Sequence, residues 1–139
     1  MKVREAMAKT ISTASPTDTV RQVAELMKEE DCGFVPIVEE GHLVGVVTDR
    51  DIVVRCLTDG HGDIGNEMAA EVMSTKVVTV GPEDDIKEAA HRMATAEVRR
   101  LPVVVDGDVV GVLSLGNLIQ ATQDAGPAVE AVLGVTHGA

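Results

Sequence analysis

Two pairs of polar residues in this chain have a spacing that could do chemistry. They are Thr48 with Asp51, and Ser114 with Asn117, and each places a hydroxyl three residues before a side-chain oxygen. Each pair follows an apolar run typical of a strand and stands where a helix is expected to begin. This is the spacing of a capping box, which satisfies the free amides at a helix amino terminus. Capping alone would explain both pairs, and that interpretation stays open beside any role in binding.

The rest of the chain offers little of the chemistry that enzymes use. No Ser-His-Asp or Cys-His arrangement is supported by spacing, and there is neither a Walker phosphate loop nor a paired set of metal ligands. Cys32 and Cys56 are the only thiols, and we interpret them as small hydrophobes in a reducing compartment. We therefore expect a protein that is not an enzyme, binds no metal and requires no cofactor.

The charge and composition argue against several partners. The net charge is −11 and the only aromatic residue is Phe34, so both phosphate neutralisation and base stacking are disfavoured. No signal peptide or long apolar span is present. We expect a cytoplasmic protein that contacts neither nucleic acid nor membrane.

The two polar pairs belong to an internal duplication with a spacing of 66 residues. Shifting the chain by that distance aligns residues along both halves without a gap. The matched residues are Glu5/Glu71, Met7/Met73, Thr13/Thr79, Pro16/Pro82, Asp18/Asp84, Ala24/Ala90, Met27/Met93, Pro36/Pro102, Val38/Val104, Gly41/Gly107 and Gly45/Gly111.

Periodicity and turn signals predict the same order of elements in each copy, strand–helix–strand–strand–helix, after a short helical lead-in at Val3–Met7. In the first copy the elements are a strand at residues 10–13, a helix capped at Thr17 or Asp18 that carries the stripe Val20, Val23, Ala24 and Met27 to about Glu30, strands at Phe34–Val38 and Leu43–Val47 joined by a turn at residues 39–42, and a helix from Asp49 to Leu57. In the second copy they are a strand at Val77–Val80, a helix carrying the stripe Ile86, Ala89, Ala90 and Met93, a hairpin of Leu101–Val105 and Val109–Leu113 across Asp106-Gly107, and a helix from Leu115 to about Asp124.

The predicted domains follow the duplication. Residues 1–60 form the first repeat, 61–68 a linker, 69–124 the second repeat and 125–139 a tail with a weak helical pattern at Ala128–Leu133. A repeat of about 50 residues cannot cover both faces of its own sheet. We expect an α+β protein in which two repeats pack sheet to sheet about a pseudo-twofold axis.

The pattern resembles the CBS (cystathionine β-synthase) domain, and the tandem copies resemble one stand-alone CBS pair, or Bateman module. The features that carry the resemblance occur twice and in register: the Pro-x-Asp helix start, Pro36/Pro102 in the second strand, and the run from Gly45 or Gly111 that ends in Thr/Ser-x-x-Asp/Asn.

The resemblance implies a regulatory module that binds an adenosine nucleotide or adenosyl compound in clefts between the repeats. AMP, ADP or ATP is expected ahead of S-adenosylmethionine or NAD. Asp51 would accept both ribose hydroxyls with Thr48 beside it, and Ser114 and Asn117 would be their counterparts. A carboxylate suits a diol because it offers several acceptor lone pairs, whereas an amide has one oxygen.

The same resemblance assigns the remaining ligand contacts. Phosphates would meet Arg50, Arg99 and Arg100, and adenine would lie against backbone and apolar groups that include Thr13, Val35, Pro36, Thr79 and Pro102. The two arginines at 99 and 100 could instead be solvated partners of Glu97 or Asp106.

Family members of this type assemble as homodimers that act on a target protein, here unknown. The helical faces with Ile52, Val53 and Cys56, and with Leu118 and Ile119, are expected to make the dimer contact. The alternative function is a structural or protein-interaction dimer whose clefts stay empty.

Overall fold

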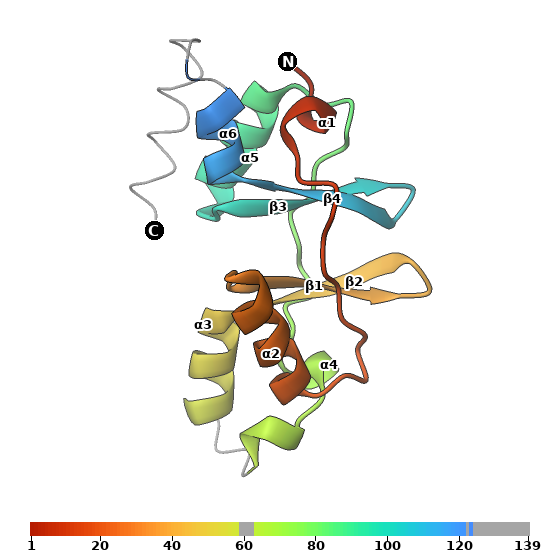
Figure 1. Cartoon of the computed structure of the whole chain (residues 1–139), viewed down its shortest axis with the longest axis vertical. Helices are drawn as coiled ribbons and strands as arrows, with labels where there is room; N and C mark the ends of the chain where they lie inside the picture. Colours follow the sequence, from red (N-terminus) through yellow and green to blue (C-terminus); the bar gives the residue numbers. More distant parts are fainter. Residues whose placement is uncertain (59–62, 122, 124–139) are drawn as a thin grey trace. The chain divides into compact units, whose positions relative to one another are not determined.

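The computed structural model describes residues 1–58, 63–121 and 123, and it confirms the mixed α+β class (Figure 1). In chain order its elements are α1 (Val3–Ala6), α2 (Val20–Glu30), β1 (Phe34–Glu39), β2 (His42–Thr48), α3 (Asp49–Asp51), the π-helix η1 (Ile52–Cys56), the 3-10 helix η2 (Ile64–Asn66), α4 (Ala69–Val72), α5 (Ile86–Ala96), β3 (Arg100–Val105), β4 (Asp108–Ser114) and α6 (Leu115–Ala121). The predicted tail, with its helix at Ala128–Leu133, lies outside the described residues.

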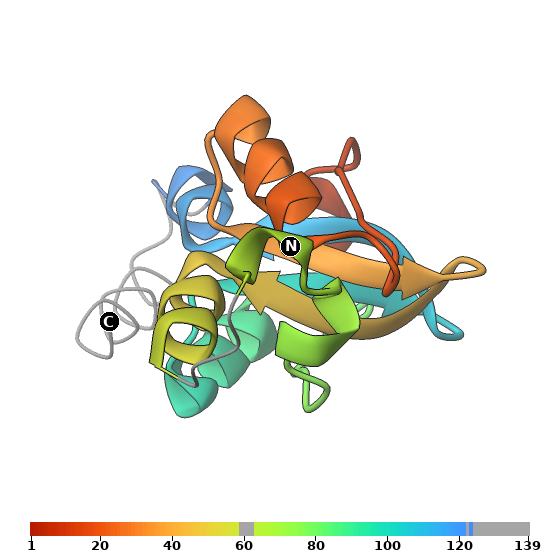
Figure 2. The ribbon, with the colours of Figure 1, turned by 90° about the horizontal axis from the view of Figure 1, so that it is seen from below.

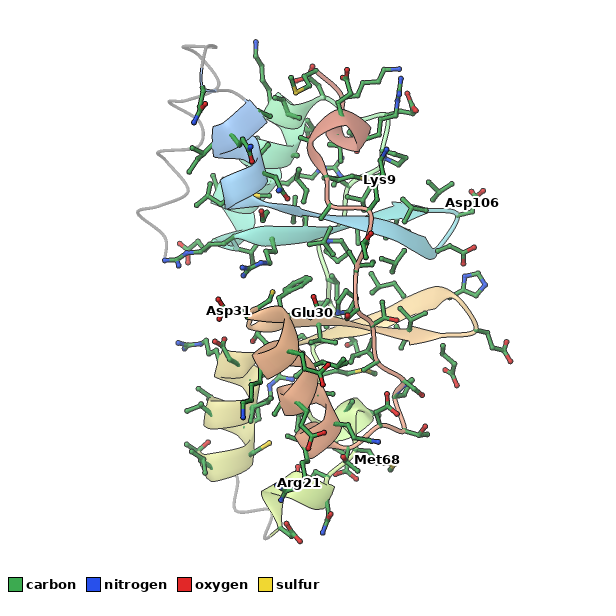
Figure 3. All side chains as sticks on the ribbon, in the orientation of Figure 1. Lys9, Arg21, Glu30, Asp31, Met68 and Asp106 are labelled. Carbon is green, nitrogen blue, oxygen red and sulfur yellow. The ribbon has the colours of Figure 1, made fainter. Side chains whose placement is uncertain are left out.

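Each repeat contains one antiparallel hairpin, β1–β2 in the first and β3–β4 in the second. Both hairpins turn through two residues with positive φ, which a tight primed turn requires. These are Glu40 (51°) with Gly41 (86°), and Asp106 (51°) with Gly107 (89°). Asp106 marks the tip of the second hairpin in Figure 3. The predicted hairpins are confirmed.

The first strand predicted in each repeat is reduced to a single bridge. Ala14 pairs with Ile37 in parallel, through Ala14 N to Pro36 O at 3.0 Å and Val38 N to Ala14 O at 2.8 Å. Extending this pairing in one direction would need the amide of Pro36, and in the other the amide of Pro16. Proline has no amide hydrogen, so the ladder stops on both sides. Residues 10–13 are therefore not a strand.

The second repeat shows the same limit. Val80 donates to Pro102 O at 3.1 Å and accepts from Val104 N at 2.9 Å, with Pro82 as the second proline. The predicted strand Val77–Val80 is therefore wrong for the same reason.

The two long helices supply the apolar stripes that the sequence predicts, with one difference. On α5 all four stripe residues are buried: Ile86, Ala89, Ala90 and Met93. On α2, Val20 and Val23 are buried, whereas Ala24 is exposed and Met27 half-buried. The stripe on α2 is therefore narrower than predicted.

The chain forms two compact units that differ from the sequence repeats. The first-hairpin unit is Ser12–Val77, and the second-hairpin unit is Met1–Ile11 together with the described residues from Val78 onward. Each repeat thus gives its leading helix to the other repeat's hairpin, α1 to β3–β4 and α4 to β1–β2. In Figure 1, α1 lies beside α5 and α6, which it contacts. Figure 2 gives a second view of α2 and α4 beside the β1–β2 hairpin.

Matching hydrogen bonds hold the exchanged helices. Val3 N donates to Asp84 O at 2.8 Å, and the equivalent Ala69 N donates to Asp18 O at 2.7 Å. Val3 is fully buried in one core and Ala69 in the other. The exchange therefore completes the core of each unit.

Candidate functional site

The Thr48–Asp51 pair forms a complete capping box at the start of α3. Asp51 Oδ2 accepts from Thr48 N at 2.9 Å, and Thr48 Oγ1 accepts from Asp51 N at 3.1 Å. The first of these bonds fixes one oxygen of the Asp51 carboxylate, and the Asp51 side chain remains 15% exposed. One carboxylate oxygen is used by the cap, and the other has its closest charged partner at 3.8 Å.

The Ser114–Asn117 pair repeats this geometry at the start of α6. Asn117 Oδ1 accepts from Ser114 N at 3.0 Å, and Ser114 Oγ accepts from Asn117 N at 3.0 Å. Because the cap uses the single amide oxygen, what remains of the Asn117 head group is mainly an amide donor. The two pairs share backbone geometry and differ in the group they can offer a ligand.

The glycine that begins each run makes room for an exchanged segment. A Cβ at Gly45 would lie 2.7 Å from Met73 Sδ and 2.9 Å from Ser74 O. A Cβ at Gly111 would lie 2.8 Å from Met7 Sδ and 2.7 Å from Ala8 O. Glycine is required at both positions because the backbones approach too closely for any side chain.

Arg55 is a part of the first site that the sequence analysis missed. Its Nη1 donates to Val72 O and Met73 O, both at 2.9 Å, and its Nη2 donates to Ser74 Oγ at 3.2 Å. Its Nε lies 3.8 Å from Asp51 Oδ1. The spacing of four residues from Asp51 could have signalled the ion pair, but the contacts to α4 depend on the exchange of segments.

Three apolar residues predicted to line the adenine are buried. Val35 is 3% exposed and belongs to the core of the first-hairpin unit. Pro36 and Pro102 are buried as well, and their carbonyl groups accept the bridge bonds from Ala14 and Val80.

The two threonines lie where the chain passes between its units. Thr13 is exposed, and Thr79 is half-buried with its carbonyl accepting from Arg92 Nη1 at 2.6 Å. Their segments cross between the units at Ile11/Ser12 and Val77/Val78. Within the part of the chain that the structure describes, residues 11–13 make no backbone–backbone hydrogen bond.

The predicted phosphate-binding arginines differ in exposure and share the lack of an ion pair among the described residues. Arg50 and Arg99 are exposed and Arg100 is half-buried. Across residues 1–58 and 63–121, none of the three forms an ion pair, so the predicted alternative partners Glu97 and Asp106 are not engaged.

The hairpin register brings two of these arginines to the second polar pair. Arg100 stands opposite Ser114 in the register of β3 and β4, and Leu115 N donates to Arg99 O at 2.8 Å. In the first hairpin Phe34 stands opposite Thr48, and Asp49 N donates to Gly33 O at 3.1 Å.

Each unit thus collects one half of the predicted site residues. The first-hairpin unit holds Thr13, Val35, Pro36, Thr48, Arg50 and Asp51, and the second-hairpin unit holds Thr79, Arg99, Arg100, Pro102, Ser114 and Asn117.

The predicted dimer contact is wrong for two of its residues, Cys56 and Leu118, because both side chains are buried. Cys56 is 2% exposed and Leu118 is 1% exposed, because both pack into the cores of their own units. The exposed apolar side chains on and beside these helices are Val53 (54%), Val54 (42%), Leu57 (64%) and Ile119 (46%).

Two carboxyl groups outside the two polar pairs, Glu83 and Asp85, have a lowered pKa. A hydrogen bond from Lys2, supported by the charges of Lys2 and Arg4, lowers the pKa of Glu83. A hydrogen bond from the Lys87 amide lowers the pKa of Asp85, at the start of α5.

The described residues contain neither a metal-binding cluster nor a membrane-spanning helix. No group of three or more His, Cys, Asp and Glu side chains there could hold a metal ion. None of the helices among them is both long and apolar enough to span a bilayer.

Each repeat contains a hairpin that leads into a capped helix, and the two repeats match. The protein is therefore of the tandem-repeat α+β class. The chain belongs to the CBS domain family, whose model matches residues 3–57 and 69–124. It is 36% identical over 135 residues to the CBS domain-containing protein YhcV of Bacillus subtilis, covering 97% of this chain and 95% of that protein.

Solved structures of CBS proteins share the fold. The crystal structure of Hypoxic Response Protein I with two coordinated zinc ions is 28% identical and has a TM-score of 0.79, covering 86% of this chain and 98% of that one. The structure of CBSX2 in complex with AMP has a TM-score of 0.77 at 24% identity, covering 88% of this chain and 96% of that one. At 24% identity, the likeness to CBSX2 shows a shared fold and nothing more.

Proposed function

We propose that this protein is a regulatory sensor that binds an adenosine nucleotide, AMP, ADP or ATP, and that Asp51 is the ribose-binding residue of its stronger site. The observation that carries the proposal is the Asp51 carboxylate. The cap occupies Oδ2, whereas Oδ1 lies 3.8 Å from its nearest charged partner and the side chain is 15% exposed. A fixed carboxylate with spare lone pairs suits two adjacent hydroxyl donors.

Thr48 supports the same role from the other side of the cap. Its Oγ1 accepts the Asp51 amide, so the hydroxyl hydrogen is still available to a ribose or phosphate oxygen. Capping and binding are therefore compatible uses of this pair. Ser114 and Asn117 would form a second, weaker site of the same design.

The phosphates of the ligand would be bound by Arg50, Arg99 and Arg100. Arginine suits phosphate because its planar fork presents several donors at once. Adenine would contact the segments of Thr13 and Thr79, together with Val35, Pro36 and Pro102. Val35 and both prolines are buried, and both proline carbonyls already accept backbone hydrogen bonds, so the segments of Thr13 and Thr79 would make the larger part of this contact.

The fold supports an adenosyl ligand in general terms. CBSX2, a structure of the same fold, contains AMP. For this chain the identity of the nucleotide rests on its own residues, and S-adenosylmethionine and NAD are the secondary candidates. That the ligand lies in clefts between the two repeats stays a prediction.

Regulation would work by a shift of population. A ligand can move a conformational equilibrium only by the difference in its affinity for the two states. We propose that the protein acts as a cytoplasmic homodimer without enzymatic activity, and that the ligand changes what the dimer presents to a target protein. Exposed Val53, Val54 and Leu57 are the surface residues that favour this assembly.

The second candidate function is an interaction module without ligand, which the same exposed apolar residues favour. Thermal melts with adenosine, AMP, ADP, ATP, S-adenosylmethionine and NAD separate the two. A ligand at 100 times its Kd should stabilise the protein by about 2.7 kcal/mol, and so raise Tm by several degrees. If no compound shifts the melt, and mass spectrometry of the purified protein finds no small molecule, the interaction module is supported.

A further inference from the structure

Arg55 connects the first site to the exchanged segment of the same unit. Its two Nη atoms donate to Val72 O, Met73 O and Ser74 Oγ, at 2.9, 2.9 and 3.2 Å. The remaining Nε faces Asp51 Oδ1 at 3.8 Å. The three contacts to residues 72–74 fix the plane of the guanidinium, and so fix where its charge stands relative to the carboxylate.

The second site has no such connection. The residue equivalent to Arg55 is Ala121, and the residue equivalent to Ser74 is Ala8. Ala8 keeps the backbone bridge of the exchanged segment, with Ala8 N to Val112 O at 2.9 Å, just as Ser74 N binds Val46 O at 2.9 Å. The arginine is therefore not needed to dock an exchanged segment, and its presence in one copy calls for another role.

We propose that Arg55 is a positioning residue that aligns the Asp51 carboxylate for ribose and couples occupancy of this site to residues 72–74. The inference rests on the proposed function, because it assumes that Asp51 binds the ligand. With Oδ2 held by the Thr48 amide and Oδ1 facing Arg55, neither oxygen rotates freely. A ligand that bonds Oδ1 then acts on the fork that holds residues 72–74.

The position of this segment gives the coupling a consequence. Residues 72–74 lie three residues before the point at which the chain leaves the first-hairpin unit, between Val77 and Val78. A ligand at Asp51 would therefore be sensed at the connection between the two units. A ligand at Asn117 would not be sensed through an equivalent arginine.

The test combines calorimetry with amide hydrogen exchange, using AMP as the probe. In the wild type, AMP should slow exchange of the Met73 and Ser74 amides, which donate to Ala69 O and Val46 O. Arg55→Ala should weaken AMP binding at the Asp51 site about fivefold, the scale of a partly exposed ion pair. It should also abolish the AMP-dependent slowing at residues 73–74.

Three further variants separate positioning from charge and from general stability. Arg55→Lys keeps the charge but cannot hold the carbonyl groups and face Asp51 together, so it should bind AMP as weakly as Arg55→Ala. Ser74→Ala, which matches Ala8, should reduce the AMP-dependent slowing while the protein stays folded. Arg92→Ala removes an arginine that binds Thr79 O in the other unit, and it should leave the exchange response unchanged.

The outcomes distinguish the two levels of the proposal. If the wild type binds none of adenosine, AMP and ATP, the proposed function fails and this inference fails with it. If AMP binds the wild type, but Arg55→Ala or Arg55→Lys keeps its affinity and the exchange response, only the role of Arg55 is overturned.

Discussion

The two polar pairs of this protein are alike in backbone and differ in charge, because the first carries the Asp51 carboxylate and the second the neutral Asn117 amide. Thr48–Asp51 and Ser114–Asn117 form the same reciprocal hydrogen bonds, within about 0.1 Å of each other in length. The charged neighbours of the first pair are Asp49, Arg50 and Arg55, and those of the second pair are Arg99 and Arg100.

Packing explains part of this difference. A Cβ at Gly33 would lie 2.4 Å from Asp49 Oδ2, so no side chain fits there while that carboxylate is in place. The equivalent positions in the second copy are Arg99 and Leu115, so a side chain stands in place of the glycine where the carboxylate is absent. Both copies thus keep the same capped backbone, whereas the side chains around it differ together at Gly33/Arg99 and at Asp49/Leu115.

The largest expected effect is the loss of binding at the first site in Asp51→Ala. Two hydrogen bonds to a charged group contribute about 1.5–3 kcal/mol each, so the affinity for adenosine should fall by about 100-fold or more. Calorimetry measures the affinity, and a thermal melt of the unliganded variant measures the cost of the lost cap, about 1 kcal/mol.

Asp51→Asn is the matched control, because it keeps one oxygen for the Thr48 amide and copies the second site. It should melt near the wild type and bind adenosine weakly. If Asp51→Ala collapses without ligand while Asp51→Asn binds normally, Asp51 is a cap and nothing more.

The reverse exchange, Asn117→Asp, should strengthen the second site. A carboxylate keeps the bond to the Ser114 amide and adds an anionic acceptor, which is worth about 1 kcal/mol more per bond than a neutral one. We expect the affinity for adenosine at this site to rise by about fivefold to tenfold. Titration in the Asp51→Ala background isolates the effect, and an unchanged weak site would show that the second pair binds no ribose.

Arg100→Ala tests the charge around the second pair. Its guanidinium forms no ion pair within the described residues and stands opposite Ser114. The variant should lose about tenfold in affinity for ATP, on the scale of a charge-assisted hydrogen bond, and little for adenosine. Arg21→Ala, on the exposed surface of α2, is the control. Equal losses for ATP and adenosine would remove the phosphate role.

The smallest expected effect concerns the two exchanged helices. Glu83 binds Lys2 at 2.5 Å and Arg4 at 3.2 Å, and these contacts lower its pKa below the usual value of about 4.5. The ion pairs therefore stabilise α1 above that pH and are lost as the pH falls through the lowered pKa. The equivalent residues near α4 are Thr17, Met68 and Ala70, which carry no charge.

Hydrogen exchange between pH 7 and pH 3, corrected for the intrinsic rate, should show protection of residues 3–8 declining slightly more than that of residues 69–74. Glu83→Gln should remove the difference. Equal behaviour of the two helices in the wild type would show that the exposed ion pairs contribute nothing measurable.

Much of the local structure was predictable from the sequence. Positive-φ turn residues marked both hairpins, the apolar stripes marked α2 and α5, and the Thr-x-x-Asp spacing marked the first cap. These signals act within a few residues, so they can be interpreted without knowledge of distant neighbours. The first strand predicted in each repeat was wrong. Pro16 and Pro36 stop the pairing of the first one, but this can be recognised only once Ile37 is known to be the partner of Ala14.

The sequence by itself determined the duplication, the hairpins and the paired caps, because each depends on spacing along the chain. The tertiary structure alone decided that α1 and α4 exchange units, that Cys56 and Leu118 belong to cores, and that Arg55 meets residues 72–74. These features join residues far apart in the chain, so they depend on which surfaces pack together when the cores form.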